Sequence, residues 1–301
     1  MKVLIVSGFL GAGKTTFIKE LYNRVKKNIV ILENEYGQEN IDSSILNEKE
    51  NMNIWELTEG CICCSVKANF ATSVLAISNT LNPEILIVEP TGIGMLSSIL
   101  ENLLKIQYDR IEILKPITFI DCKNIDYYLN NPDFKEIFID QLVNASNVFI
   151  TKTENLNEKE IENIVQKLTN LNPNGIIEKR HYKNMNDDFF TELLEKNYSD
   201  FQLSSKKSVN LSLETTALKN ISFNSYDHFY SYMSAFVRGD FGNIERAKGF
   251  FTIEDKWVKF DIVAKEFKIE RCEKMPDSKI VIIGTNLQKE KIRILFQGEF
   301  L

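Results

Sequence analysis

The sequence predicts an α/β fold with a doubly wound, mostly parallel sheet, followed by a smaller α+β domain. In the first part of the chain, short apolar, β-branched runs alternate with longer segments of helical periodicity. Such continuous apolar strands are typical of a parallel sheet covered on both faces. After about residue 204 the pattern changes to short strands with few helices. We therefore expect one domain over residues 1–203 and a second over 204–301, joined through the polar stretch at 203–208.

The expected elements of the first domain follow one another in βαβ order. Strands are predicted at 3–6, 28–32, 85–88, 117–120, 148–150 and 176–177, and helices at 14–26, 67–79, 132–144 and 158–171. In the second domain a strand-like segment precedes a helix at 226–236 and strands at 249–252, 257–260 and 279–283. Hydrophobic residues make up 44% of the 301 residues and charged residues 26%, so the chain can bury sizeable cores and is not a disordered or fibrous sequence.

The charge balance argues against two classes of partner. There are 36 basic and 42 acidic residues, a net charge of −6, which gives no general attraction for nucleic acid or anionic lipid. No stretch approaches the roughly 20 apolar residues that span a bilayer. We expect a cytoplasmic protein that binds neither nucleic acid nor membrane.

Residues 8–15 fit the pattern G-x-x-x-x-G-K-[ST] between a predicted strand and a predicted helix. In this P-loop the glycines let backbone N–H groups surround phosphates at the positive end of the helix. Lys14 is expected to reach the β and γ phosphates, and the Thr15 hydroxyl to bind Mg²⁺. The predicted phosphate-binding set is Gly8, Gly11, Ala12, Gly13, Lys14, Thr15 and Thr16. The order of strand, loop and helix favours a P-loop NTPase over a glycine-rich turn with a chance lysine.

Glu89-Pro-Thr-Gly92 follows the strand at 85–88. A carboxylate at the tip of the sheet beside a P-loop can hold Mg²⁺ through water, and the Gly92 amide can contact the γ-phosphate. Glu89 is therefore predicted as a catalytic residue with Lys14, and as a Mg²⁺ residue with Thr15. Asp121 ends the strand at 117–120 in a similar way, but a helix cap is an equally good interpretation.

Thr151-Lys152-Thr153-Glu154 follows the strand at 148–150. GTPases commonly place Asn-Lys-x-Asp here, with the lysine along the base and the acid accepting from the guanine edge. Glutamate is one methylene longer than aspartate and can still make that contact. We predict guanine preference through Thr151, Lys152 and Glu154, and the start of a helix is the alternative interpretation.

Three of the five cysteines, Cys61, Cys63 and Cys64, lie within four positions. Thiolates favour Zn²⁺ and its late first-row neighbours. Three close thiolates rarely complete a tetrahedron, so a carboxylate such as Glu33 or Glu35, or a group from a partner, would add a ligand. An incompletely enclosed site suits a metal held for transfer or sensing. Cys122 and Cys272 are isolated and are expected to be small core residues.

Together these motifs resemble the CobW family of P-loop GTPases, which are metallochaperones with a CobW-type C-terminal domain. The matching segments are 7–16, 33–37, 60–64, 89–92 and 246–249. The resemblance implies slow GTP hydrolysis that gates delivery of a metal to a client protein. The metal is most often Zn²⁺, with Co²⁺ in a corrinoid-pathway variant. Carried over by residue, the metal site involves Glu33, Cys63 and Cys64, with Cys61 near.

Other functions and partners stay open from the sequence. A metal-responsive regulator would bind a partner with incidental hydrolysis, whereas a P-loop kinase would leave the cysteines unexplained. The segment from Glu33 to Cys64 lies between the P-loop helix and the γ-phosphate loop, so metal and nucleotide would affect each other's binding reciprocally. A homodimer is a further expected partner to be tested.

Overall fold

The computed structural model describes residues 1–33, 53–56, 67–107, 110–198, 213–263, 266–296 and 299–300. The chain divides into two compact units, which contain the described residues up to 198 and from 213 onward, respectively. The predicted boundary between residues 203 and 204 lies outside the described residues. Within those ranges, every helix is too short or too polar to cross a membrane.

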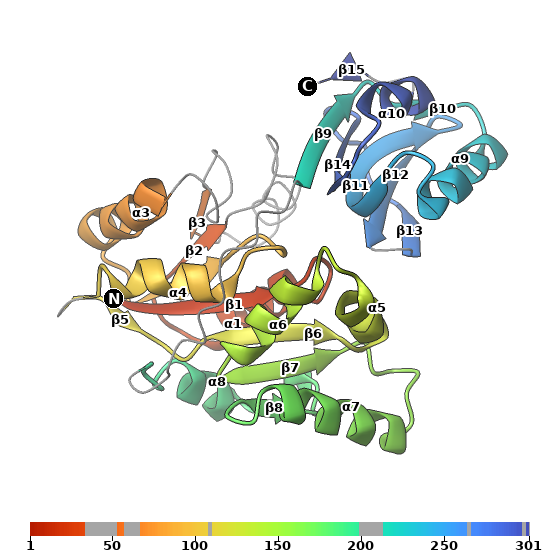
Figure 1. Cartoon of the computed structure of the whole chain (residues 1–301). Helices are drawn as coiled ribbons and strands as arrows, with labels where there is room; N and C mark the ends of the chain where they lie inside the picture. The colour runs from red at the N-terminus through yellow and green to blue at the C-terminus, as the bar shows by residue number, and fades with distance from the viewer. Residues whose placement is uncertain are drawn as a thin grey trace. The chain divides into compact units, whose positions relative to one another are not determined.

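The first unit is built on a parallel sheet with the strand order β3-β2-β4-β1-β6-β7-β8 (Figure 1). The strands are β1 (Lys2–Gly8), β2 (Ile29–Glu33), β3 (Asn53–Glu56), β4 (Ile85–Glu89), β6 (Ile117–Asp121), β7 (Asn147–Thr151) and β8 (Ile176–Glu178), with β5 (Glu112–Ile113) paired to the start of β1. Because β1 lies between β4 and β6, the loop that follows β1 has the loops that follow those two strands as its neighbours. The parallel sheet predicted from the sequence is confirmed.

Helices cover both faces of this sheet. They are α1 (Lys14–Arg24), α3 (Lys67–Thr80), α4 (Leu96–Leu104), α5 (Ile125–Asn130), α6 (Lys135–Val143), α7 (Glu158–Leu171) and α8 (Asp187–Leu193), with 3₁₀ turns η1 (Cys122–Asn124) and η2 (Tyr182–Asn184). Phe119 of β6 packs against Phe17 of α1, with ring centroids 4.9 Å apart. The preceding residue, Thr118, donates a 2.9 Å hydrogen bond to the carbonyl of Gln141 on α6. Since consecutive strand residues point to opposite faces, α1 and α6 lie on opposite sides.

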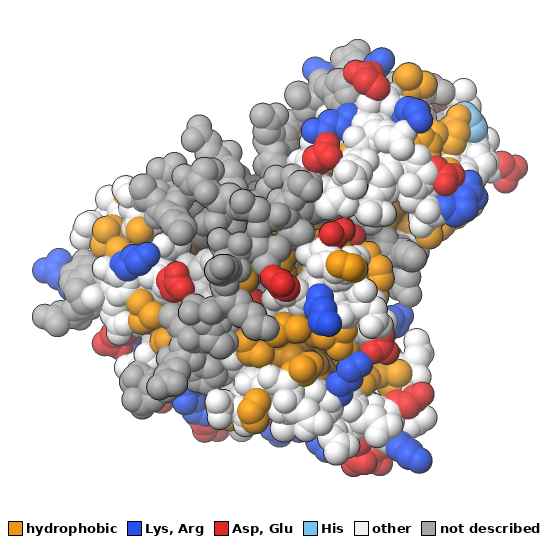
Figure 2. Space-filling view, viewed as in Figure 1, with side chains coloured by type: hydrophobic (Ala, Val, Ile, Leu, Met, Phe, Trp, Pro, Cys, Tyr) orange, Lys and Arg blue, Asp and Glu red, His pale blue; other side chains and the backbone are white. Residues whose placement is uncertain are grey.

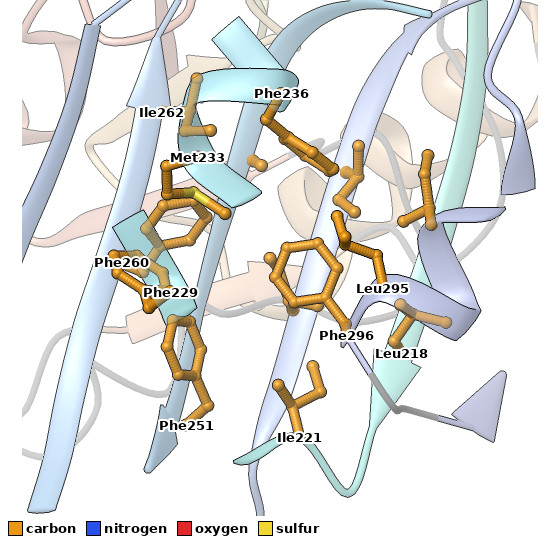
Figure 3. Packing of buried hydrophobic residues seen from close by; sticks show 14 of the residues in the cluster. Leu218, Ile221, Phe229, Met233, Phe236, Phe251, Phe260, Ile262, Leu295 and Phe296 are labelled. Atoms are coloured by element: carbon orange, nitrogen blue, oxygen red, sulfur yellow. The ribbon is translucent and has the colours of Figure 1, made fainter. Parts of the chain in front are cut away.

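The second unit is an antiparallel sheet with two helices on one face. Its strand order is β13-β12-β11-β14-β9-β15, and the short β10 pairs with β11. The elements are β9 (Leu213–Lys219), β10 (Ser222–Phe223), α9 (Tyr226–Arg238), β11 (Asn243–Ile253), β12 (Lys256–Val263), β13 (Glu266–Arg271), β14 (Lys279–Thr285), α10 (Lys289–Phe296) and β15 (Glu299–Phe300). Phe229 and Phe236 of α9 belong to the core between the helices and the sheet: Phe229 contacts Phe251 and Phe260 of the strands, and Phe236 contacts Phe296 of α10 (Figure 3). This arrangement confirms the α+β class predicted for the second domain.

Charged side chains of both signs are interspersed over the described surface of each unit on the face shown in Figure 2. This mixture agrees with the modest net charge of −6.

Candidate nucleotide and metal site

The P-loop connects β1 to α1 through three glycines with positive φ. Gly8 has φ 136°, Gly11 has φ 71°, and Gly13, the N-cap of α1, has φ 103°. At Gly8 a Cβ would lie 2.4 Å from the Phe119 carbonyl oxygen, so β6 leaves no room for a side chain. These conformations favour glycine and let the loop curl back on itself.

Lys14, the first residue of α1, folds into this loop. Its Nζ donates to the carbonyl oxygens of Gly8 at 2.9 Å and Phe9 at 3.2 Å, and the residue is only 6% exposed. The ammonium group therefore lies within the ring of backbone that a phosphate would enter. Ala12 is buried and Thr16 is exposed, so only part of the predicted phosphate-binding set is enclosed.

Thr15 and Glu89, the residues predicted for Mg²⁺, are in direct contact. The Thr15 hydroxyl donates to the Glu89 carboxylate, at 2.9 Å to Oε1 and 3.2 Å to Oε2. The contact forms because α1 starts beside the end of β4, which pairs with β1 in parallel. A hydroxyl and a carboxylate are hard oxygen ligands of the kind that Mg²⁺ prefers, so the residues present fit this ion.

The loop after β4 is pressed against the P-loop. A Cβ on Gly92 would lie 2.5 Å from the Leu10 amide nitrogen and 2.8 Å from the Leu10 Cγ, so a residue larger than glycine cannot occupy this position without displacing the P-loop. The Gly92 amide, predicted to contact the γ-phosphate, is thus part of a loop that packs directly on the backbone of the predicted P-loop.

One of the predicted base-binding residues, Thr151, also contacts the P-loop. The buried Thr151 hydroxyl lies within hydrogen-bonding distance of the carbonyl oxygens of Ala12 (3.0 Å) and Ile120 (3.2 Å). Lys152 has a left-handed backbone, with φ 59°, and Glu154 is exposed. Thr151 therefore connects the end of β7 to the loop between β1 and α1.

Asp121 caps a short helix, which was one of its two interpretations, and it also forms an ion pair that the sequence did not predict. Its carboxylate caps η1 by accepting from the Lys123 amide at 3.0 Å, and it accepts from Asn124 Nδ2 at 2.8 Å. It also forms a 2.6 Å ion pair with Lys152. The lysine predicted to lie along the base is therefore held by a buried carboxylate on the neighbouring strand.

Comparison with known proteins places these observations in a family. Residues 2–178 match the CobW/HypB/UreG nucleotide-binding domain. The chain belongs to the CobW/HypB/UreG family. Residues 223–298 match the cobalamin synthesis protein CobW C-terminal domain, so both units of this CobW-type chain have a counterpart.

Relatives in this family carry names that refer to zinc. The chain is 30% identical over 207 residues to zinc-regulated GTPase metalloprotein activator 1 of Schizosaccharomyces pombe, covering 64% of this chain and 48% of that protein. It is 27% identical over 166 residues to the zinc chaperone YjiA of Escherichia coli, covering 52% and 51%. The chain thus spans about half the length of the curated relatives it matches. Among solved structures, the Zn(II)-bound YjiA GTPase from E. coli aligns over 99% of this chain and 98% of its own, with 18% identity and a TM-score of 0.49.

Only one of the residues predicted to bind the transition metal is described. Glu33 is buried at the end of β2, in register with Glu89 on β4. Cys61, Cys63, Cys64 and Glu35 lie outside the described residues. Within the described ranges, no three His, Cys, Asp or Glu side chains gather as a metal site would require. The metal site of this CobW-type chain therefore stays a prediction.

The two isolated cysteines have the surroundings of packing residues. Cys122 is buried, and desolvation followed by the negative charge of Asp121 raises the pKa of its thiol to about 12. Cys272 is partly buried beside Phe250 and Val281, and burial also raises its pKa. Because metal ligation requires the thiolate, both are poor ligands.

Proposed function

We propose that the chain is a Mg²⁺-dependent GTPase that binds zinc and delivers it to a client protein in a nucleotide-gated way. The observation that carries the GTPase assignment is the Thr15–Glu89 contact beside the buried Lys14, because it joins the predicted Mg²⁺ residues to the predicted phosphate-binding group. The family match and the names of the relatives support the same class of protein.

Each side chain of the nucleotide site has a distinct proposed task. Lys14 exchanges its carbonyl partners for the β and γ phosphates, and its charge offsets the charge that develops there. The Thr15 hydroxyl and Glu89 hold Mg²⁺, which when bound neutralises phosphate charge. Thr151, Lys152 and Glu154 contact the base and favour guanine over adenine.

The zinc site is proposed to involve Glu33, Cys63 and Cys64, with Cys61 near. Support comes from the register of the sheet, in which Glu33 is the direct neighbour of Glu89. Adjacent strands lie about 4.8 Å apart, so a metal ligand at one position and a Mg²⁺ residue at the other are coupled through one pair of strands. Nucleotide and Mg²⁺ that bind at Glu89 would then alter the affinity for zinc, and zinc would alter the affinity for nucleotide by the same factor.

Zinc titration with and without a non-hydrolysable GTP analogue and Mg²⁺ tests this proposal. Replacing Cys63 and Cys64 by serine should lower zinc affinity at least a hundredfold, whereas Cys272→Ser, the matched control, should leave it unchanged. If the double variant binds zinc with the affinity of the wild type, the proposed zinc site is wrong. If the GTP analogue does not change the zinc affinity of the wild type, the proposed gating is wrong. Repeating the titration with Co²⁺ compares the two metals. Equal affinities for GTP and ATP would overturn the guanine preference.

Delivery and assembly need their own measurements. The rate at which bound zinc passes to an apo-metalloprotein should differ between the analogue-bound and GDP-bound states, and equal rates would favour a regulator that only senses the metal. The native mass in each nucleotide state tests the homodimer.

A further inference from the structure

We propose that Gln141, on α6, is a positioning residue that aims the Gly92 amide at the γ-phosphate and so makes the site discriminate triphosphate from diphosphate. Gln141 is 1% exposed, and nothing in the sequence marks it. Its Nε2 donates to the carbonyl oxygens of Gly92 at 3.2 Å and Gly94 at 2.8 Å. Both amide protons of one side chain are thus used on the loop that follows β4. This role rests on the proposed GTPase function and deepens it.

The need for such a residue follows from the glycine itself. Gly92 has to be glycine because a Cβ would collide with the Leu10 amide nitrogen at 2.5 Å. Glycine, however, has the widest backbone freedom of any residue. The residue that allows close packing against the P-loop therefore does not by itself fix the direction in which its N–H points. Another group must supply that direction.

Hydrogen bonds fix the peptide units on both sides of Gly92. The Thr91 carbonyl oxygen accepts from the Gly94 amide at 2.9 Å, which turns the Gly92 N–H to the opposite side because a trans peptide holds its C=O and N–H antiparallel. On the other side, the Gly92 carbonyl is held by Gln141, and the Ile93 N–H donates to the Thr91 hydroxyl at 3.3 Å. With both peptide units fixed, the Gly92 N–H has one direction before any nucleotide binds, and such preorganised donors contribute most to stabilising developing charge.

Helix α6 holds the far end of the same segment as well. The N-cap of α4 is Met95, whose side chain makes no capping hydrogen bond. Asp140 supplies the cap from outside: its Oδ2 accepts from the Ser97 amide at 3.1 Å. Asn144 in turn donates to Asp140 Oδ1 at 3.2 Å. The segment from Gly92 to Ser97 is therefore attached to α6 at both ends.

The same helix contacts the P-loop. Phe138 of α6 packs near Phe9, with ring centroids 6.1 Å apart, and Phe9 supplies one of the carbonyls that hold Lys14. One rigid helix thus positions both the loop that carries Lys14 and the loop that carries Gly92. Gln141 touches neither the proposed substrate position nor the Mg²⁺ residues in the contacts that the structure gives, and it acts through the backbone of Gly92.

The chain offers a matched control at Asn172. This buried amide also donates to two backbone carbonyl oxygens, those of Leu142 at 2.7 Å and Ala145 at 2.9 Å. It lies in the turn before β8, and loops that precede parallel strands lie at the opposite edge of the sheet from the P-loop. Leu142 belongs to α6, so Asn172→Leu removes the same kind of interaction from the C-terminal end of that helix while leaving its hydrogen bonds to the loop after β4, and it therefore controls for a general loosening of α6.

The test compares Gln141→Leu with Asn172→Leu. We would measure the affinities for guanosine 5′-(β,γ-imido)triphosphate and for GDP in Mg²⁺, and amide hydrogen exchange over residues 90–97 without nucleotide. In Gln141→Leu the ratio of the two affinities should fall about tenfold, the effect of one weakened hydrogen bond to a charged group, and exchange over 90–97 should accelerate. Asn172→Leu should change neither quantity, although it lowers the melting temperature. If Gln141→Leu does not fold, Gln141→Met keeps the length and unbranched shape of the side chain while removing the donors, and it should show the same fall in the ratio.

The outcomes separate this role from the proposed function. A wild-type ratio in Gln141→Leu, or an equal fall in Asn172→Leu, overturns the role of Gln141 and leaves the GTPase standing. Failure of the wild type to bind the triphosphate analogue in Mg²⁺ overturns the proposed GTPase, and the role of Gln141 falls with it.

Discussion

Replacing Gly92 by alanine is the most direct perturbation of the contact between the two loops that we propose to bind phosphate. The backbone of Gly92 does not have a positive φ, so the substitution is not opposed by strain at the residue itself. The obstacle is the neighbour: the new Cβ would lie 2.5 Å from the Leu10 amide nitrogen, and real Cβ atoms are essentially never closer than 3.0 Å to another atom. The loops must therefore separate by at least the difference of 0.5 Å.

The loss of stability depends on which atom the new Cβ would clash with. Leu10 N is backbone, so relief requires movement of the P-loop rather than rotation of a side chain. Overpacking of this kind costs about 1–3 kcal/mol of unfolding free energy, equivalent to about 2–4 °C in melting temperature per kcal/mol. Catalysis should lose more, because misplacement by about 1 Å can reduce a rate a hundredfold. We expect Gly92→Ala to lower the single-turnover rate of GTP hydrolysis 10- to 100-fold.

Gly175→Ala is the matched control for this measurement. Its Cβ would lie 2.3 Å from Asn172 Nδ2, which is the end of a side chain, so the clash disturbs the two hydrogen bonds of that buried amide. The site lies in the turn before β8, at the edge of the sheet opposite the P-loop. The control should lose melting temperature and keep the hydrolysis rate of the wild type. If Gly92→Ala hydrolyses GTP at the wild-type rate, the close packing of the two loops has no part in the reaction and our reasoning is wrong.

Three further predictions address other parts of the first unit. Lys14→Ala should abolish hydrolysis, measured as phosphate release, because the loop loses its only side-chain cation; retained activity would remove Lys14 from the phosphate site. Burial raises the pKa of Asp140 above 3.8, so the folded state holds this proton more tightly than the unfolded state, and the resulting stability is lost as the pH rises through the raised pKa. The unfolding free energy of Asp140→Asn relative to wild type should therefore increase from pH 4 to pH 7 in urea titrations, and a constant difference would contradict the shift. Because the pKa of Cys122 is about 12, only about one thiol in ten thousand is ionised at pH 8. Iodoacetamide should therefore label Cys122 in the unfolded but not in the folded protein, as measured by mass spectrometry. Rapid labelling of the native chain would refute this.

Strongly periodic segments were predictable because local sequence alone determines them. The helix predicted over 158–171 is α7 (Glu158–Leu171), and its start is set by a capping box between Asn157 and Glu160. The helix predicted over 14–26 ends two residues early, since Val25 is extended. Helix α4 was not predicted. Its buried apolar residues recur at helical spacing, but the helix has only nine residues and no capping residue of its own marks its start, because the cap comes from a distant aspartate.

The proximity of Thr15 to Glu89 was predictable for a general reason: the ends of adjacent parallel strands share one edge of the sheet. Gln141 was not, because a single glutamine in a helical pattern looks the same whether it faces solvent or a neighbouring loop. Its importance depends on a contact across 49 residues of sequence. Residues that contact a substrate often belong to recognisable sequence motifs. Residues that hold those motifs in place act through tertiary contacts, which cannot be read from a single sequence.

Thr151 shows how a departure from a motif can carry structural meaning. The usual asparagine is replaced by threonine, and the hydroxyl reaches the carbonyls of Ala12 and Ile120. Ala12 belongs to the P-loop, so the loop that is proposed to contact the base and the loop that is proposed to contact the phosphates share a hydrogen bond. Next to it, Lys152 is held by Asp121, whose strand lies between β1 and β7. A nucleotide that moves the P-loop would therefore also shift the loop that is proposed to contact the base, because Thr151 connects the two. The double variant Thr151→Val with Lys14→Ala should then lose less base discrimination than the sum of the two single variants, because each acts through the same loop.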